Sequence, residues 1–222
     1  MLRTFIRVLI CLLSTWLCAA HAQSVLTQFP PKINPEGRYV FYSHGYIVEG
    51  DNPTPRNSRW GTYEFPRIKS DLADHGYHLI AYHRGKNTDP REHAQELVTQ
   101  AQRLIKQGVK PEAITFIGFS RGGYITILVS NLLRLKDVNF VLLAACGESI
   151  TATESVELYG EVLSVHETSD DLVLPCQALA ARSSNISSFE EILISTGKEH
   201  GAFYQPIPEW LQPVKQWVNR TM

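Results

Sequence analysis

Two patterns of apolar and polar positions alternate along this chain and predict strands and helices in turn. Short apolar runs rich in β-branched and aromatic residues predict strands. They lie at residues 39–42, 78–82, 114–119, 138–145, 162–166 and 192–194. Between them, apolar residues spaced three or four apart predict helices. These span about residues 65–75, 92–107, 122–133, 176–182 and 209–218.

This alternation indicates the fold class. Strands that are apolar throughout are buried on both sides, which is typical of an α/β protein with a mostly parallel sheet covered by helices on both faces. The carboxyl ends of such strands share one edge, where ligands bind. The longest irregular stretch runs from Gly45 to Tyr63 and contains Pro53 and Pro55. We expect it to lie over that edge, and we expect no second domain.

The amino-terminal segment has the pattern of an export signal. Two arginines and an apolar run over residues 8–20 precede the small residues Ala20 and Ala22. The run is shorter than the ~20 residues of a membrane span. We therefore expect residues 1–22 to be a signal peptide and residues 23–222 to form one exported domain, periplasmic or secreted, with no stable membrane anchor after cleavage. An uncleaved anchor is the alternative.

Composition and charge narrow the function classes. Hydrophobic residues make up 44% of the 222 residues and charged residues 19%, which excludes a disordered chain, a coiled coil and a collagen-like fibre. The formal net charge is -1. Because no overall positive field points to nucleic acid or to an anionic membrane, we expect neither as a partner.

The first candidate for chemistry is the segment from Gly118 to Gly122, Gly-Phe-Ser-Arg-Gly, which joins the strand predicted at 114–119 to the helix predicted at 122–133. A serine on a tight strand-to-helix turn has a strained backbone, and glycines two residues to either side relieve the crowding. The Ser120 hydroxyl would then be exposed at the sheet edge. The alternative is a glycine-bordered turn with an inert serine.

With this motif between a strand and a helix, the chain resembles the α/β-hydrolases from about Tyr39 to Val218. This family carries Ser, then Asp or Glu, then His in that chain order. The resemblance implies that Ser120 is the nucleophile. It also implies that His200, the only histidine after position 166, is the general base that takes the serine proton.

The acid of the triad has two candidates. The segment from His166 to Pro175 resembles the family's acid loop, in which an Asp lies four residues after the last strand position. Asp170 fits that register, although an extra residue before Pro175 departs from the usual spacing. We expect Asp170 to hold the imidazole in the right tautomer. Asp171, one residue away, stays open as the alternative.

The oxyanion hole is implied by His44-Gly45, which directly follows the first predicted strand. In the family, a His-Gly at this point opens a loop that donates one N–H to the developing negative charge. By position, the donors here would be the backbone amides of Tyr46 and Arg121. We expect His44 itself to be structural and to bond within the loop.

The resemblance implies a small serine hydrolase without a large cap, carboxylesterase-like, that cleaves an acyl bond in a small molecule, most directly a carboxylic ester. A thioesterase or acyltransferase would use the same triad, and a non-catalytic binding protein of the same fold is the alternative from another class. We expect no metal and no cofactor, because no metal-ligand spacing, P-loop or dinucleotide fingerprint occurs. Four aromatic residues are candidates to line the pocket, with packing against one another as the alternative: Tyr46, Trp60, Tyr63 and Phe203.

After removal of the leader, Cys146 and Cys176 are the only cysteines. Cys146 follows the strand after the nucleophile helix, and Cys176 follows the acid loop. Consecutive strands of such a sheet are often neighbours, and export permits a disulfide. A disulfide here would brace the acid loop against the adjacent strand end, and two unpaired buried thiols are the alternative.

Overall fold

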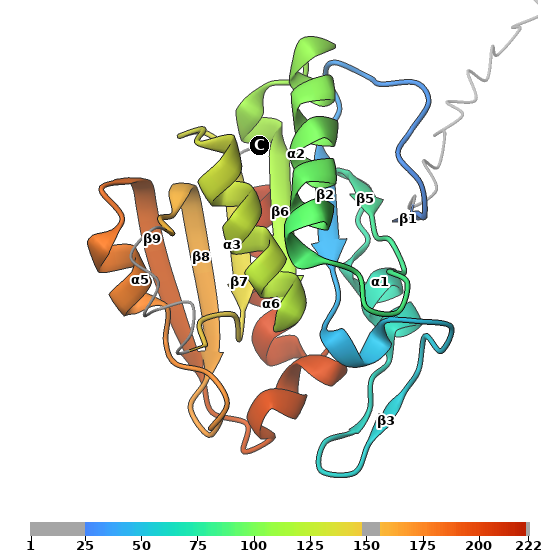
Figure 1. Cartoon of the computed structure of the whole chain (residues 1–222), viewed down its shortest axis with the longest axis vertical. Helices are drawn as coiled ribbons and strands as arrows, with labels where there is room; N and C mark the ends of the chain where they lie inside the picture. The colour runs from blue at the N-terminus through green and yellow to red at the C-terminus, as the bar shows by residue number, and fades with distance from the viewer. Residues whose placement is uncertain (1–24, 148–155, 221–222) are drawn as a thin grey trace, which may run out of the picture.

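The computed structural model describes residues 25–147 and 156–220, so the expected leader at residues 1–22 lies outside the described part of the chain. Within that part, seven strands form one sheet in the order β1-β5-β2-β6-β7-β8-β9, and all neighbouring pairs are parallel (Figure 1). The strands are β1 (Val25–Leu26), β2 (Tyr39–Ser43), β5 (His78–Ile80), β6 (Ile114–Phe119), β7 (Asn139–Leu143), β8 (Tyr159–Glu167) and β9 (Asn185–Ile194).

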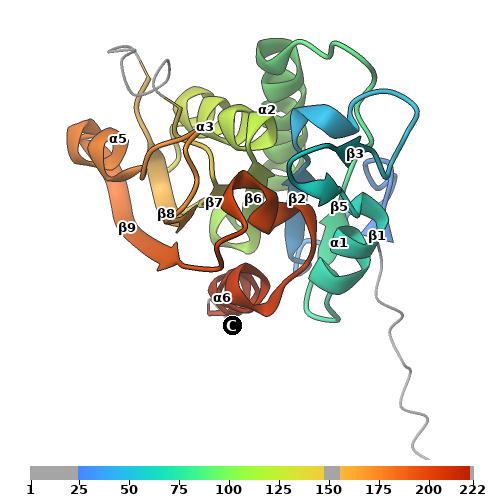
Figure 2. The ribbon, with the colours of Figure 1, turned by 90° about the horizontal axis from the view of Figure 1, so that it is seen from below.

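Helices cover both faces of this sheet (Figure 2). α2, α3 and α5 lie on one face, and α1 and α6 lie on the other. The α-helices are α1 (Phe65–Leu72), α2 (Pro90–Lys106), α3 (Arg121–Leu133), α5 (Gln177–Arg182) and α6 (Pro208–Asn219), and the 3-10 helices are η1 (Tyr46–Val48), η2 (Pro111–Ala113) and η3 (Glu199–Tyr204). The predicted α/β architecture is confirmed.

The core has one layer on each face of the sheet. Phe41, Phe116 and Phe140 face one another across β2, β6 and β7. Their rings stack with centroids 4.7 and 5.8 Å apart in the layer under α2 and α3. Val40 and Tyr42, on either side of Phe41, belong to the layer under α1 and α6. Because successive side chains of a strand point to opposite faces, a strand covered on both sides must be apolar throughout.

The order of the strands places the site. β5 lies on one side of β2 and β6 on the other, so the direction in which strands are added reverses between β2 and β6. At the carboxyl ends of these two strands, Ser43 pairs with Gly118. The crevice beyond such a reversal is where open α/β sheets bind ligands.

The segment from Gly45 to Tyr63, predicted to be irregular, is partly ordered. It contains η1 and a hairpin of β3 (Arg56–Asn57) and β4 (Gly61–Thr62). The Asn57 side chain closes the hairpin turn by accepting the N–H groups of Arg59 and Trp60. Such local side-chain to backbone bonding leaves no mark on hydrophobic periodicity, which explains why the prediction missed it. The segment does lie at the carboxyl edge of the sheet, as expected (Figure 1).

Several element boundaries also differ from the prediction, and those of α1 and β9 have a clear physical reason. α1 ends at Leu72 rather than near residue 75, because Ala73 is extended and Asp74 accepts the N–H of Gly76 in a turn. β9 is much longer than the predicted strand at 192–194. It is an edge strand with partly exposed residues along most of its length, and polar residues at 187–188 and 190–191 interrupt the apolar run.

Cys146 and Cys176 form a disulfide in which both residues are buried. Cys146 follows β7, and Cys176 immediately precedes α5. Beside the bond, the N–H of Leu174 donates to the carbonyl oxygen of Cys146 at 2.9 Å. The end of the acid loop is therefore tied to the end of the neighbouring strand, as the sequence allowed.

Replacing both cysteines by alanine is expected to lower the free energy of unfolding by about 3–4 kcal/mol, because a disulfide closing a loop of this length constrains the unfolded chain by about that much. The two cysteines are 30 residues apart. Urea denaturation of oxidised wild type, reduced wild type and the double variant tests this. Reduced wild type should have the same urea midpoint as the double variant. Equal midpoints for all three proteins, or two free thiols in the denatured unreduced protein, would contradict the prediction.

Candidate active site

Ser120 lies at the turn between β6 and α3, and its backbone has φ 53° and ψ −116°. A positive φ is strained for any residue with a side chain. Positions 118 and 122 require glycine because backbone carbonyl oxygens lie too close to each of them for a side chain. A Cβ at Gly118 would lie 2.1 Å from the carbonyl oxygen of Gly122, and one at Gly122 would lie 1.9 Å from that of Ser43. The turn therefore presses α3 against the end of β2 and holds Ser120 at the sheet edge.

The side chains of Ser120, His200 and Asp170 form one continuous hydrogen-bonded chain. His200 Nε2 lies 2.9 Å from Ser120 Oγ, and His200 Nδ1 lies 2.6 Å from Asp170 Oδ2. An ionised carboxylate only accepts, so Nδ1–H donates to Asp170 and Nε2 is left to accept the serine proton. The His200 and Asp170 side chains are 6% and 0% exposed. Water therefore competes little for these bonds.

The two candidate acids have different surroundings. Asp170 Oδ1 accepts the N–H of Leu172 at 2.9 Å, which orients the carboxylate toward His200. Asp171 points to solvent with a side chain 60% exposed, and its Oδ2 lies 3.0 Å from Arg59 Nη2. The hydrogen bond from Arg59 lowers the pKa of Asp171. The structure thus brings Asp170 to the histidine, and Asp171 belongs to a surface ion pair.

A buried carboxylate that the sequence analysis missed joins the loops carrying Asp170 and His200. Glu167, the last residue of β8, accepts the N–H and hydroxyl groups of both Ser169 and Thr196. Burial raises the pKa of Glu167, but these hydrogen bonds outweigh it and the net shift is downward. The available signal was an acidic residue ending an apolar strand, a position where only a well-bonded carboxylate is tolerated.

The two expected oxyanion donors begin two helices at adjacent strand ends. Tyr46 is the first residue of η1, after β2, and Arg121 is the first residue of α3, after β6. N–H groups in the first turn of a helix have no acceptor within that helix, and α3 adds its positive dipole end. Tyr46 and Ser120 line the same cleft. The N–H groups of Tyr46 and Arg121 thus have no acceptor within their own helices, and both lie at the sheet edge that carries Ser120.

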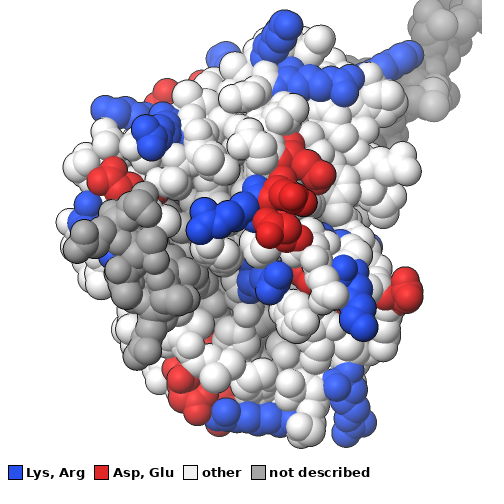
Figure 3. Space-filling model, viewed as in Figure 1, with Lys and Arg blue, Asp and Glu red and all other residues white. Residues whose placement is uncertain are grey.

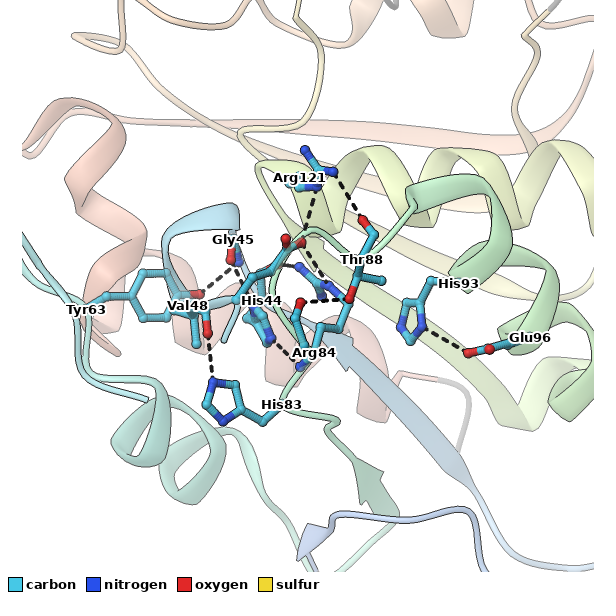
Figure 4. Close-up of polar contacts among 12 residues, drawn as sticks. His44, Gly45, Val48, Tyr63, His83, Arg84, Thr88, His93, Glu96 and Arg121 are labelled. Atoms are coloured by element: carbon cyan, nitrogen blue, oxygen red, sulfur yellow. Dashed lines mark hydrogen bonds and ion pairs between the residues drawn. The ribbon is translucent and has the colours of Figure 1, made fainter. Parts of the chain in front are cut away.

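His44 bonds within and beneath the loop, as expected. Its Nδ1 lies 2.8 Å from the carbonyl oxygen of Gly45, and its Nε2 accepts the N–H of Arg84 at 3.0 Å (Figure 4). Burial, followed by the nearby Arg84 cation, lowers the pKa of His44 to about 2. The ring is therefore neutral, with Nδ1 as donor and Nε2 as acceptor.

A cleft of about 470 Å³ opens above Ser120 and His200. Most of its other wall residues are apolar or aromatic: Tyr46, Ile47, Trp60, Phe119, Leu172 and Tyr204. The remaining side chains are polar: Glu49, Asn57, Lys86 and Asn87. The cleft therefore suits a compact molecule that is mainly apolar.

Only two of the four aromatic residues proposed for the pocket line it. Tyr46 and Trp60 do so, whereas Tyr63 and Phe203 are fully buried. The Tyr63 hydroxyl lies 2.8 Å from that of Tyr42, and the Phe203 ring packs on Phe119. The prediction was wrong for these two because loop aromatics next to a site also form the packed layer beneath it.

In residues 25–147 and 156–220, no three His, Cys, Asp or Glu side chains form a set that could hold a metal ion. No helix in those ranges is both long and apolar enough to cross a membrane. Acidic and basic side chains lie interspersed over the face shown in Figure 3, so no single sign of charge dominates that face.

The chain matches no protein-family model and no curated protein, but solved structures are similar to it. SOBER1 from Arabidopsis thaliana has a TM-score of 0.55 at 13% identity, over 82% of this chain and 98% of SOBER1. Est1E from Butyrivibrio proteoclasticus, solved with ferulic acid bound, has a TM-score of 0.54 at 16% identity, over 88% of this chain and 92% of Est1E. A lipase-esterase related protein from Clostridium acetobutylicum has a TM-score of 0.53 at 13% identity, over 86% of this chain and 97% of that protein. Similarity at this level of identity shows a shared fold.

Proposed function

From the α/β-hydrolase fold of this chain, we propose that it is a serine hydrolase that cleaves a carboxylic ester of a small molecule. The observation that carries the proposal is the hydrogen-bonded chain from Ser120 Oγ through His200 to Asp170. Neither an inert turn serine nor a binding surface requires a strained serine, an imidazole and a buried carboxylate hydrogen-bonded in series.

The geometry supports a two-step acyl transfer. Ser120 Oγ attacks the ester carbonyl while His200 Nε2 takes its proton, and Asp170 stabilises the imidazolium that forms. The amides of Tyr46 and Arg121 donate to the carbonyl oxygen as it becomes negative. His200 then protonates the leaving alcohol, and water, activated by the same imidazole, releases the acid from the acyl-enzyme.

The cleft supports an ester with a compact apolar or aromatic acyl group. Trp60, Phe119 and Leu172 supply apolar surface beside Ser120. Est1E, which shares the fold, was solved with the aromatic acid ferulic acid. Esters of this size, from acetate to hydroxycinnamate, form the substrate class that we propose.

Export belongs to the same proposal. Residues 1–22 have the pattern of a signal peptide, and a disulfide such as Cys146–Cys176 persists in oxidising compartments. A periplasmic or secreted enzyme would meet its substrates outside the cytoplasm.

A fluorophosphonate probe and a graded ester panel test the function. The probe should label the wild type, with the adduct on the peptide containing Ser120, and should not label Ser120→Ala. p-Nitrophenyl esters of increasing chain length, a methyl hydroxycinnamate, a thioester and an anilide should be cleaved in an order led by an ester. Absence of both labelling and turnover in a folded sample would favour a binding protein of this fold, and faster thioester cleavage would indicate a thioesterase.

A further inference from the structure

A buried ion cluster lies directly behind the proposed oxyanion hole. Glu49 Oε1 lies 3.2 Å from Arg121 Nε and 3.5 Å from Arg84 Nε. The Glu49 and Arg84 side chains are each only 2% exposed. Removing charges from water carries a large cost that only close pairing offsets. The triad does not use these three side chains, so the burial of Glu49 and Arg84 at this place calls for another explanation.

The cluster joins the two residues whose amides are the proposed donors. Glu49 follows the single turn of η1, and its N–H donates to the carbonyl oxygen of Tyr46 at 2.9 Å. The Arg121 guanidinium reaches from the first residue of α3 to the Glu49 carboxylate. On the way it lies over the Tyr46 ring, 4.9 Å from the centroid, and donates to the carbonyl oxygen of Thr88 at 3.1 Å (Figure 4). The side chain of Arg121 therefore contacts the loop that carries Tyr46.

Arg84 secures the same loop from beneath. Its Nη2 donates to the carbonyl oxygen of His44, and its N–H donates to His44 Nε2 (Figure 4). Its carbonyl oxygen accepts the N–H of Gly50 at 3.0 Å. Arg84 thus holds the loop from His44 to Gly50 at both ends, and the Arg121 guanidinium contacts Tyr46 and Glu49 within it.

We propose that Glu49 and the Arg121 guanidinium act as positioning residues that set the separation of the Tyr46 and Arg121 amides. Both amides must come within about 2.7–3.1 Å of one oxygen to stabilise it. They begin two helices from different parts of the chain, and η1 is only three residues long. The Glu49–Arg121 pair with the Tyr46 ring, here called the clasp, supplies the missing constraint. This inference rests on the proposed hydrolase function.

Glu49→Gln and Arg121→Met test the clasp. Each variant is expected to lose about tenfold to a hundredfold in kcat with KM changed less than about threefold, less than the loss on deleting a donor outright. The affinity of a trifluoromethyl ketone, whose adduct carries the oxyanion, should fall by the same factor as kcat/KM. The pH midpoint of kcat should stay at its wild-type value, because His200 and Asp170 are untouched. The double variant should lose little more than either single variant, since both remove one contact.

The matched control is Glu161→Gln. Glu161 pairs with Arg220 at 2.8 Å near the amino end of β8, at the sheet edge opposite Ser120, and its replacement should leave kcat unchanged. Arg121 is about one-third exposed, so Arg121→Met keeps the test decisive if Glu49→Gln fails to fold.

Wild-type kcat and ketone affinity in folded clasp variants, or additive losses in the double variant, would overturn the clasp while leaving the hydrolase in place. A wild type that neither turns over the ester panel nor reacts with fluorophosphonate would overturn the hydrolase itself, and the clasp with it.

Discussion

Replacing His200 by alanine is expected to lower kcat for the best ester of the panel about 10⁴- to 10⁶-fold, because serine and histidine act as one unit in such triads. His200 Nε2 is the group that lies within hydrogen-bond distance of Ser120 Oγ in the structure. Without it, the hydroxyl must lose its proton to water. Steady-state kinetics measures the loss, at an enzyme concentration high enough that the activity of the variant exceeds that of contaminating esterases.

His78→Gln is the matched control for this prediction. His78 begins β5, at the amino edge of the sheet, where its ring packs on Tyr39. Its replacement should leave kcat within about threefold of wild type, as is usual for a change away from the reacting groups. A His200→Ala protein that retains a tenth or more of wild-type kcat would show that another base serves Ser120, and the triad would have to be abandoned.

Replacing Asp170 by asparagine is expected to lower kcat about 10⁴-fold, while Asp171→Asn should stay within about threefold of wild type. An amide at position 170 can donate to His200 Nδ1 and so favours the tautomer in which Nε2 carries the proton and cannot accept the serine hydrogen. At position 171 the same change removes only the exposed ion pair with Arg59. The adjacent residues thus make a matched pair of variants with identical chemistry.

The ratio of the two kcat values decides the assignment. Thermal unfolding of both variants controls for stability, since Asp170 is buried and its replacement removes a charged partner of His200. Equal losses at the two positions, or a larger loss for Asp171→Asn, would contradict the role given to Asp170.

Hydrophobic pattern predicted the strands and helices best where burial is symmetric. β6 and α3 begin and end within a residue of their predicted bounds. Every position of β6 is buried, so apolar residues fill most of its length. The pattern predicted only the last three residues of β9 and missed the β3–β4 hairpin. The first is a partly exposed edge strand, and the second is held by the Asn57 side chain rather than by apolar contacts.

The resemblance to α/β-hydrolases, drawn from a serine between two glycines after a strand, is confirmed at the level of the fold. The register of the family's acid loop ranked Asp170 above Asp171, but it could not separate them. The difference depends on which carboxylate turns inward, and that is determined by the N–H of Leu172 on one side and the Arg59 side chain on the other.

The sequence by itself determined the parallel sheet and the serine turn at its edge, because periodicity and glycine placement act over a few neighbouring residues. The order of the three candidate triad residues came from the resemblance to the α/β-hydrolases. Only the tertiary structure decided which aspartate meets His200, that Glu167 ties two loops together, that Cys146 meets Cys176 and that Glu49 reaches Arg121. Each of these contacts joins segments far apart in the chain. Such contacts depend on the packing of whole elements, and the spacing of residues along one element carries no record of them.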